Sequence, residues 1–297
     1  MELAQEHLEN FFVLMSSGTL LSLLATRIAG KAGFYRKLSK GPYRYTPSIK
    51  DVLTVLMIFF ALQLTLMTVI LYLWNAVQTG NWHMIPQEIP EKEKIWISSL
   101  NIWLSLGGTW LFCFLFRPSV LQSVTETESL EKGHGPFFNF SFGAMSWLIC
   151  YPIVFTVSQF TGIIVQSIFH APEKEQTALT LLKASTNQPF QLVFFILSIA
   201  IVTPIIEEFL FRGILQRWFI SKIGQVNGMI LASFCFTALH FTADQGTFNL
   251  ELLPPLFVLS LYLGYLYERQ RSLWAPIGLH STFNLVSCLL ALFSEKL

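Results

Sequence analysis

Charge is scarce in this sequence. Only 12% of its 297 residues are Asp, Glu, Lys or Arg, whereas a soluble globular domain has about 25%. Hydrophobic residues make up 53% of the chain, and 28 residues are Phe. The chain therefore has more apolar surface than one water-soluble core can bury. This composition excludes a disordered chain, a basic nucleic-acid-binding protein and an ordinary soluble enzyme. We therefore predict a polytopic integral membrane protein that contacts the lipid bilayer.

Cysteine is sparse as well. The four cysteines each lie in an apolar stretch, without a CxxC pair or a spacing typical of metal ligands; they are Cys113, Cys150, Cys235 and Cys288. Cysteines in such surroundings pack as small hydrophobic residues. The sequence therefore indicates neither disulfide bonds nor a redox compartment.

Long apolar runs predict an all-α fold. A transmembrane helix needs about 20 mostly apolar residues to cross roughly 30 Å of hydrocarbon. About eight runs meet this requirement, at about 11–29, 51–74, 95–116, 138–168, 190–219, 227–243, 252–268 and 274–293. The fourth run is too long for one straight crossing, so we predict a strongly tilted helix or a break near Pro152. The fifth run also overruns and has Pro204 at its middle.

Basic residues predict the orientation of these helices. The loop after the first run collects seven of them: Arg27, Lys31, Arg36, Lys37, Lys40, Arg44 and Lys50. Because basic loops stay in the cytoplasm, this loop is expected there, and eight crossings then place both termini on the non-cytoplasmic side. The loop is either a simple positive-inside anchor or a specific site for anionic lipids. Between the fourth and fifth runs, TALTLLKA (residues 177–184) predicts a short interfacial helix.

Two adjacent carboxylates interrupt the fifth run. Of 18 acidic residues, only Glu207 and Glu208 fall well inside an apolar run, where each costs about 2.5–3.5 kcal/mol. Glu208 and Arg212 are four residues apart and share a helix face, which predicts an ion pair. Glu207 points about 100° away and is left without that partner.

Two histidines also lie within the predicted runs. His280 and Asn284 are four residues apart on the last helix and project from one face. His240 has Phe236 one turn before it as an aromatic wall. An unpaired carboxylate and an imidazole can activate water, and a second imidazole with an amide can stabilise an oxyanion. The same residue types also suit a catalytic metal or the proton relay of a carrier.

Three short motifs resemble one known family. Residues 207–212 (EEFLFR) fit EExxxR, residues 236–240 (FTALH) fit FxxxH, and residues 280–284 (HSTFN) fit HxxxN. These are the motifs of the CPBP family, the CAAX protease and bacteriocin-processing (Abi) intramembrane peptidases, in the family's order. The type II CAAX prenyl endopeptidases belong to it and share an eight-helix, all-α plan.

The resemblance implies a role for each motif residue. Glu207 would activate the attacking water together with His240, and His280 and Asn284 would form the oxyanion hole. Glu208, Arg212 and Phe236 would surround and orient the catalytic residues. A divalent metal such as zinc is either used or absent in this family; if used here, its candidate ligands are Glu207, His240 and His280.

We therefore predict an intramembrane endopeptidase with its catalytic residues on the C-terminal helices. Its substrate would be a membrane-associated peptide, either a CAAX-type prenylated tail or a bacteriocin or leader-like peptide. Residues 1–136 would form the N-terminal transmembrane helices and the basic loop. Residues 137–297 would form a helical membrane domain whose family-like core is about 190–293. The alternative is a non-enzymatic membrane scaffold or a proton-coupled carrier.

Overall fold

The computed structural model describes residues 2–38, 43, 45–80, 89–125, 135–169 and 177–294. Every regular element among these residues is a helix. In chain order they are α1 (Glu2–Lys31), α2 (Ile49–Thr79), α3 (Glu91–Phe116), α4 (Pro118–Thr125), α5 (Pro136–Phe169), α6 (Thr177–Ala184), α7 (Pro189–Leu197), η1 (Ser198–Val202), α8 (Thr203–Glu208), η2 (Phe209–Gln216), α9 (Arg217–Ile223), α10 (Gln225–Ala238), η3 (Ala243–Gln245), α11 (Phe248–Gln270) and α12 (Trp274–Ser294). The predicted all-α fold is confirmed.

Seven helices of the described part of the chain are long and apolar enough to cross a membrane. They confirm a multi-pass membrane protein. The run predicted at about 227–243 corresponds to α10, which has 14 residues and is about 21 Å long. It is therefore shorter than a full crossing, because the helix ends at Ala238 rather than continuing past His240.

The over-long fourth run forms one helix. α5 has 34 residues and passes through Pro152 without interruption. Of the two alternatives, the break is therefore wrong, and the strong tilt stays a prediction. The hydroxyl of Thr156 donates to the Pro152 carbonyl at 2.7 Å, four residues earlier. The short helix predicted in TALTLLKA is confirmed as α6.

The chain divides into two compact units that alternate along the sequence. The first unit comprises Met1–Tyr43, Thr127–Lys174 and Phe219–Leu279, and the second comprises Arg44–Glu126, Glu175–Trp218 and His280–Leu297. The predicted division between residues 136 and 137 stays a prediction.

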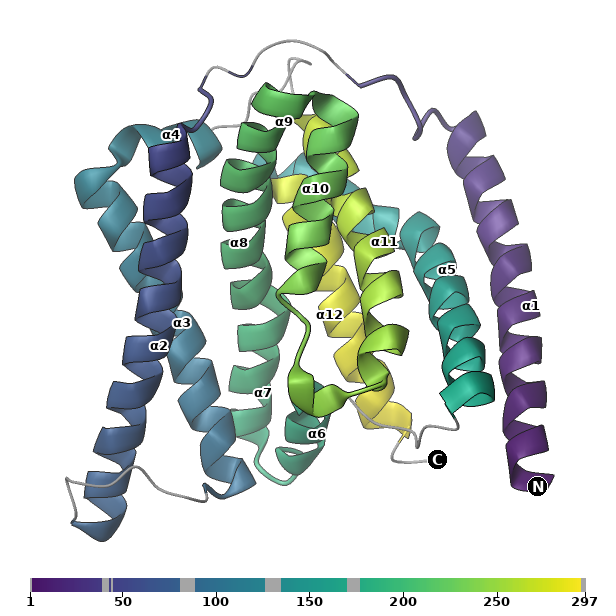
Figure 1. The fold of residues 1–297 in the computed structure, drawn as a ribbon, viewed down its shortest axis with the longest axis horizontal. Helices are drawn as coiled ribbons and strands as arrows, with labels where there is room; N and C mark the ends of the chain where they lie inside the picture. The colour runs from purple at the N-terminus through teal and green to yellow at the C-terminus, as the bar shows by residue number, and fades with distance from the viewer. Residues whose placement is uncertain are drawn as a thin grey trace. The chain divides into compact units, whose positions relative to one another are not determined.

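In the first unit, α1 lies beside α5, and α10 lies beside α11 (Figure 1). The contact of α5 with the start of α12 requires a glycine. A Cβ at Gly143 would lie only 1.8 Å from the Ala275 carbonyl oxygen. Small residues allow this close approach of helix backbones in a membrane protein.

The first loop is fastened to α11 by its aromatic residues. The Tyr265 hydroxyl donates to the Phe34 carbonyl at 2.7 Å, and Arg269 Nε donates to the same carbonyl at 3.0 Å. The hydroxyls of Tyr35 and Tyr262 are 2.9 Å apart. These contacts fit the anchoring interpretation of the loop. Lys40 and Arg44, two of the basic residues used for the orientation, lie outside the described residues.

In the second unit, α2 lies beside α3 (Figure 1). α3 in turn packs against the helical segment that contains the two adjacent carboxylates. Its Trp103 donates from Nε1 to the Ser198 hydroxyl at 3.0 Å, and the rings of Trp110 and Phe209 are 6.1 Å apart. α3 therefore supports this segment on both sides of Glu207.

Candidate active site

The fifth apolar run forms one helical rod, in which the backbone hydrogen bonds change twice from the α-helical to the π-helical pattern. Two π-helical segments, η1 and η2, enclose the six-residue helix α8. In η1 the Thr203 N–H donates to the Ser198 carbonyl five residues earlier, which widens the turn. Pro204 follows directly, at the start of α8. Such π-turns are rare in α-helices overall, and those that occur are often at functional sites. Here they flank α8, which carries Glu207 and Glu208.

Glu208 is locked by a buried ion pair. Arg212 Nε lies 3.2 Å from Glu208 Oε2, and Arg212 Nη1 donates to Glu208 Oε1 at 3.3 Å. The exposed fractions of the two side chains are 1% and 0%. The ion pair predicted from their spacing is present. Breaking such a buried pair would leave an uncompensated charge, so it fixes this part of the helix firmly.

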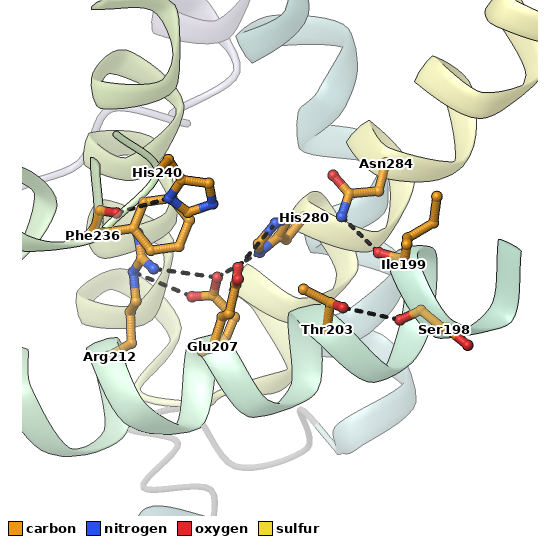
Figure 2. Close-up of polar contacts among 10 residues, drawn as sticks. Ser198, Ile199, Thr203, Glu207, Arg212, Phe236, His240, His280 and Asn284 are labelled. Carbon is orange, nitrogen blue, oxygen red and sulfur yellow. Dashed lines mark hydrogen bonds and ion pairs between the residues drawn. The ribbon is translucent and has the colours of Figure 1, made fainter. Parts of the chain in front are cut away.

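His280 joins the two carboxylates. Its Nδ1 lies 2.8 Å from Glu208 Oε1, close enough for a hydrogen bond, and its Nε2 lies 3.7 Å from Glu207 Oε2 (Figure 2). Since an ionised carboxylate only accepts, the hydrogen bond to Glu208 places a hydrogen on Nδ1. The sequence had suggested an isolated Glu207, but the imidazole of His280 lies next to it.

Glu207 remains the more accessible carboxylate. Its side chain is 20% exposed, compared with 0% for Glu208. Arg212 and the near nitrogen of His280 are directed to Glu208. The two adjacent carboxylates thus differ: Glu208 is buried and held by its neighbours, whereas the Glu207 side chain is partly exposed.

Asn284 follows His280 by one turn on α12 and contacts the π-turn. Its Nδ2 donates to the Ile199 carbonyl at 2.7 Å (Figure 2). A carboxamide nitrogen has two hydrogens, so this bond fixes the amide and leaves a second N–H. The sequence did not indicate this contact, although Pro204 in the middle of an apolar run was the signal for an irregular helix.

His240 and Phe236 belong to the first unit. His240 lies just beyond the end of α10, so the expectation that it lies within a transmembrane helix is wrong. Its ring is 4.8 Å from the Phe236 ring, which is fully buried, and its Nδ1 is 2.9 Å from the Phe236 carbonyl (Figure 2). A carbonyl only accepts, so Nδ1 donates and Nε2 is the acceptor nitrogen of the neutral ring. Its approach to Glu207 stays a prediction.

A comparison with known families matches the part of the chain that contains these residues. Residues 189–286 match the family model described as Type II CAAX prenyl endopeptidase Rce1-like. The predicted family resemblance is confirmed. A comparison with curated proteins and one with solved structures gave no match.

This matched segment begins at α7 and contains all the candidate site residues, from Glu207 to Asn284. The family implies a protease of the membrane, of the CAAX endopeptidase type. A protease family of this kind implies a peptide or protein substrate in the membrane.

The metal ligands considered from the sequence were Glu207, His240 and His280. Within the described ranges, no three His, Cys, Asp or Glu side chains are grouped so that they could hold a metal ion. The reaction proposed below for this site contains no metal step.

Proposed function

We propose that this protein is an intramembrane endopeptidase that hydrolyses a peptide bond by a water molecule activated at Glu207 and His240. The observation that supports this proposal is the difference in environment between the adjacent carboxylates. Arg212 and His280 hold Glu208, whereas the Glu207 side chain is partly exposed and its Oε2 lies 3.7 Å from His280 Nε2. A general base needs an accessible oxygen on a rigid support.

In the proposed reaction, Glu207 takes a proton from water while the water oxygen attacks the peptide carbonyl carbon. His240 binds the same water through Nε2, the nitrogen that its bond to the Phe236 carbonyl leaves as an acceptor. The tetrahedral intermediate then collapses, the carbon–nitrogen bond breaks, and the proton passes to the leaving amine. Protonating the amine is necessary because a free amide anion is a very poor leaving group.

His280 and Asn284 would stabilise the oxyanion of the intermediate. Since His280 Nδ1 donates to Glu208, its Nε2 must also carry a hydrogen if it is to donate to the oxyanion. The role therefore requires the doubly protonated ring. Glu208 and Arg212 would hold that ring in place, as a buried carboxylate does in other hydrolytic sites.

The substrate we propose is a CAAX-type prenylated tail, because the matching family model is described by that activity. A bacteriocin or leader-like peptide is the other substrate class to test. In the proposed orientation the basic first loop is cytoplasmic and both termini are on the opposite side, with the core at about 190–293.

The deciding experiment compares purified Glu207→Gln with the wild-type protein on a reporter peptide in proteoliposomes. Glutamine is nearly isosteric but cannot accept the proton, so the rate should fall about 10²–10⁴-fold. Glu91→Gln is the matched control, because Glu91 is an exposed acid at the start of α3. Equal rates for Glu207→Gln and wild type would overturn the role of Glu207, and no cleavage by either protein would support the scaffold or proton-carrier alternative.

The same pair of proteins can identify the substrate. Membranes that contain wild-type protein should accumulate peptide fragments that are missing with Glu207→Gln. Mapping their ends by mass spectrometry distinguishes cleavage near a prenylated cysteine from cleavage after a leader peptide.

A further inference from the structure

Pro204 removes a hydrogen-bond donor at the π-turn. In a π-turn each carbonyl accepts from the N–H five residues later, and Thr203 N–H donates in this way to Ser198. The next carbonyl in this register is Ile199, whose donor would be residue 204. Since proline has no N–H, the backbone cannot supply this bond.

The Asn284 side chain supplies the missing donor. Its Nδ2 lies 2.7 Å from the Ile199 carbonyl oxygen, from a helix 85 residues further along the chain. Proline in a helix interior costs about 3 kcal/mol, in part through the carbonyl that it leaves without a donor. Here that carbonyl has a specific partner, and the partner is a residue of the proposed oxyanion hole.

Neighbouring side chains hold the π-turn in this form. The Thr203 hydroxyl donates to the Ser198 carbonyl at 3.1 Å, which adds a second bond to the carbonyl that the Thr203 N–H already contacts. The buried Ser198 hydroxyl donates to the Phe194 carbonyl at 2.7 Å and accepts from Trp103 at 3.0 Å. The Ile199 carbonyl is thus presented by a turn that is bonded from two sides.

We propose that Pro204 is a positioning residue for Asn284. By keeping the Ile199 carbonyl available, it fixes the rotation of the Asn284 amide so that the second N–H can reach the oxyanion. This inference rests on the proposed function, since it assigns Pro204 a task in the same reaction. Pro204 itself touches neither water nor substrate in this scheme.

Pro204→Ala tests the proposal because it restores the backbone N–H. That N–H can then also bond the Ile199 carbonyl, so the Asn284 amide is no longer its only donor and is less firmly oriented. kcat should therefore fall at least 10-fold while KM changes less than about twofold. The loss should not exceed the roughly 10²–10³-fold expected for removing one oxyanion donor. Alanine is the best helix former, so thermal stability should not fall. Pro204→Ser restores the same N–H and serves if the alanine variant does not accumulate.

Pro189→Ala is the matched control. Pro189 stands at the start of α7, where a helix has no carbonyl for its N–H to contact. Its substitution should leave kcat unchanged. A fall in kcat equal to that of Pro204→Ala would contradict the proposal, since it would point to a general effect on the rod.

Non-additivity separates positioning from a merely structural role. If Pro204 acts through Asn284, the double variant Pro204→Ala/Asn284→Ala should be as slow as Asn284→Ala alone. Losses that multiply would overturn the proposal. Wild-type turnover of Pro204→Ala beside an inactive Glu207→Gln would overturn the role of Pro204 alone, whereas full activity of Glu207→Gln would overturn the proposed function as well.

Discussion

Among the described residues, a buried glutamate–arginine pair at helical spacing is found in each unit. In the second unit, Glu208 and Arg212 are four residues apart; in the first unit, Glu268 and Arg271 are three apart, with Arg271 Nη2 3.8 Å from Glu268 Oε2. The exposed fractions of both carboxylates are 0%. By burial, charge and sequence spacing, the two pairs are nearly equivalent.

Their other partners differ. Glu268 accepts from the Tyr43 hydroxyl and from Gln225 Nε2 at 2.9 Å, and the Arg271 guanidinium lies 4.1 Å from the centre of the Tyr43 ring. We call these four residues the Glu268 cluster. It fastens the first loop to α10 and α11, which is a structural task.

The Glu208 cluster consists of Glu208, Arg212 and His280. It adds an imidazole, and the accessible carboxylate of Glu207 lies next to it. The comparison teaches that a buried glutamate–arginine pair is not by itself a sign of catalysis. What distinguishes the second pair is the additional carboxylate that the pair leaves accessible.

The largest expected effect contrasts two residues of the first unit. His240→Ala should lower kcat by about 10²–10⁴-fold, because it removes the proposed partner of Glu207. Glu268→Gln should leave the rate per folded molecule within about twofold of wild type. Both rates are measured on the reporter peptide and normalised to the folded fraction. A similar loss in both variants would show that the Glu268 cluster also takes part in catalysis.

Removing either arginine should destabilise the protein strongly. Arg212→Gln and Arg271→Gln each leave a buried carboxylate without its cation, at a cost of about 3–5 kcal/mol. Unfolding titrations in mixed detergent micelles measure this change. Only Arg212→Gln should also lower the rate per folded molecule, since Arg271 belongs to the structural cluster. Equal residual rates would remove the functional difference between the two pairs.

Asn284→Ala should reduce kcat by about 10²–10³-fold and leave measurable activity, because one oxyanion donor is lost while His280 remains. Steady-state kinetics on the reporter peptide measure this. Asn227→Ala is the control, since Asn227 is an exposed amide on α10. If Asn284→Ala is inactive, this amide does more than donate one hydrogen bond to the oxyanion.

Tyr43→Phe should affect stability alone. The variant loses one hydrogen bond to a buried carboxylate, which costs about 1.5–3 kcal/mol for a charged acceptor. The unfolding titration should show this loss, and the rate per folded molecule should stay at the wild-type value. A changed KM would instead connect the first loop with substrate binding.

Exhaustive chelation should have the smallest effect, a change in rate of less than about twofold, because the proposed reaction contains no metal step. Metal analysis of the purified protein accompanies the assay. Loss of activity that zinc restores would favour a metalloprotease.

Contacts within one helix could be predicted from the sequence. The ion pair of Glu208 with Arg212 is a consequence of four-residue spacing, and so is the shared face of His280 and Asn284. The all-α membrane fold and the helix α6 follow from the runs of apolar residues. Because few other ionisable residues fall inside those runs, the scarcity of charge also made Glu207 and Glu208 recognisable as site candidates.

The irregular parts of helices could not be predicted. α5 continues through Pro152, whereas Pro204 follows a π-turn, although both prolines stand inside apolar runs. The difference lies in the neighbours, because a distant amide can replace the bond that proline removes. α10 ends before His240, which apolar composition alone did not indicate.

The candidate side chains, and the helices that carry Glu207, Glu208, His280 and Asn284, followed from the sequence alone, because composition and helical period act over a few residues. Which of these side chains meet depended on the packing of the helices. His280 contacts Glu208 across 72 residues of chain, and Asn284 contacts Ile199 across 85. Such contacts depend on how helices pack, and packing is set by the whole chain rather than by any one segment.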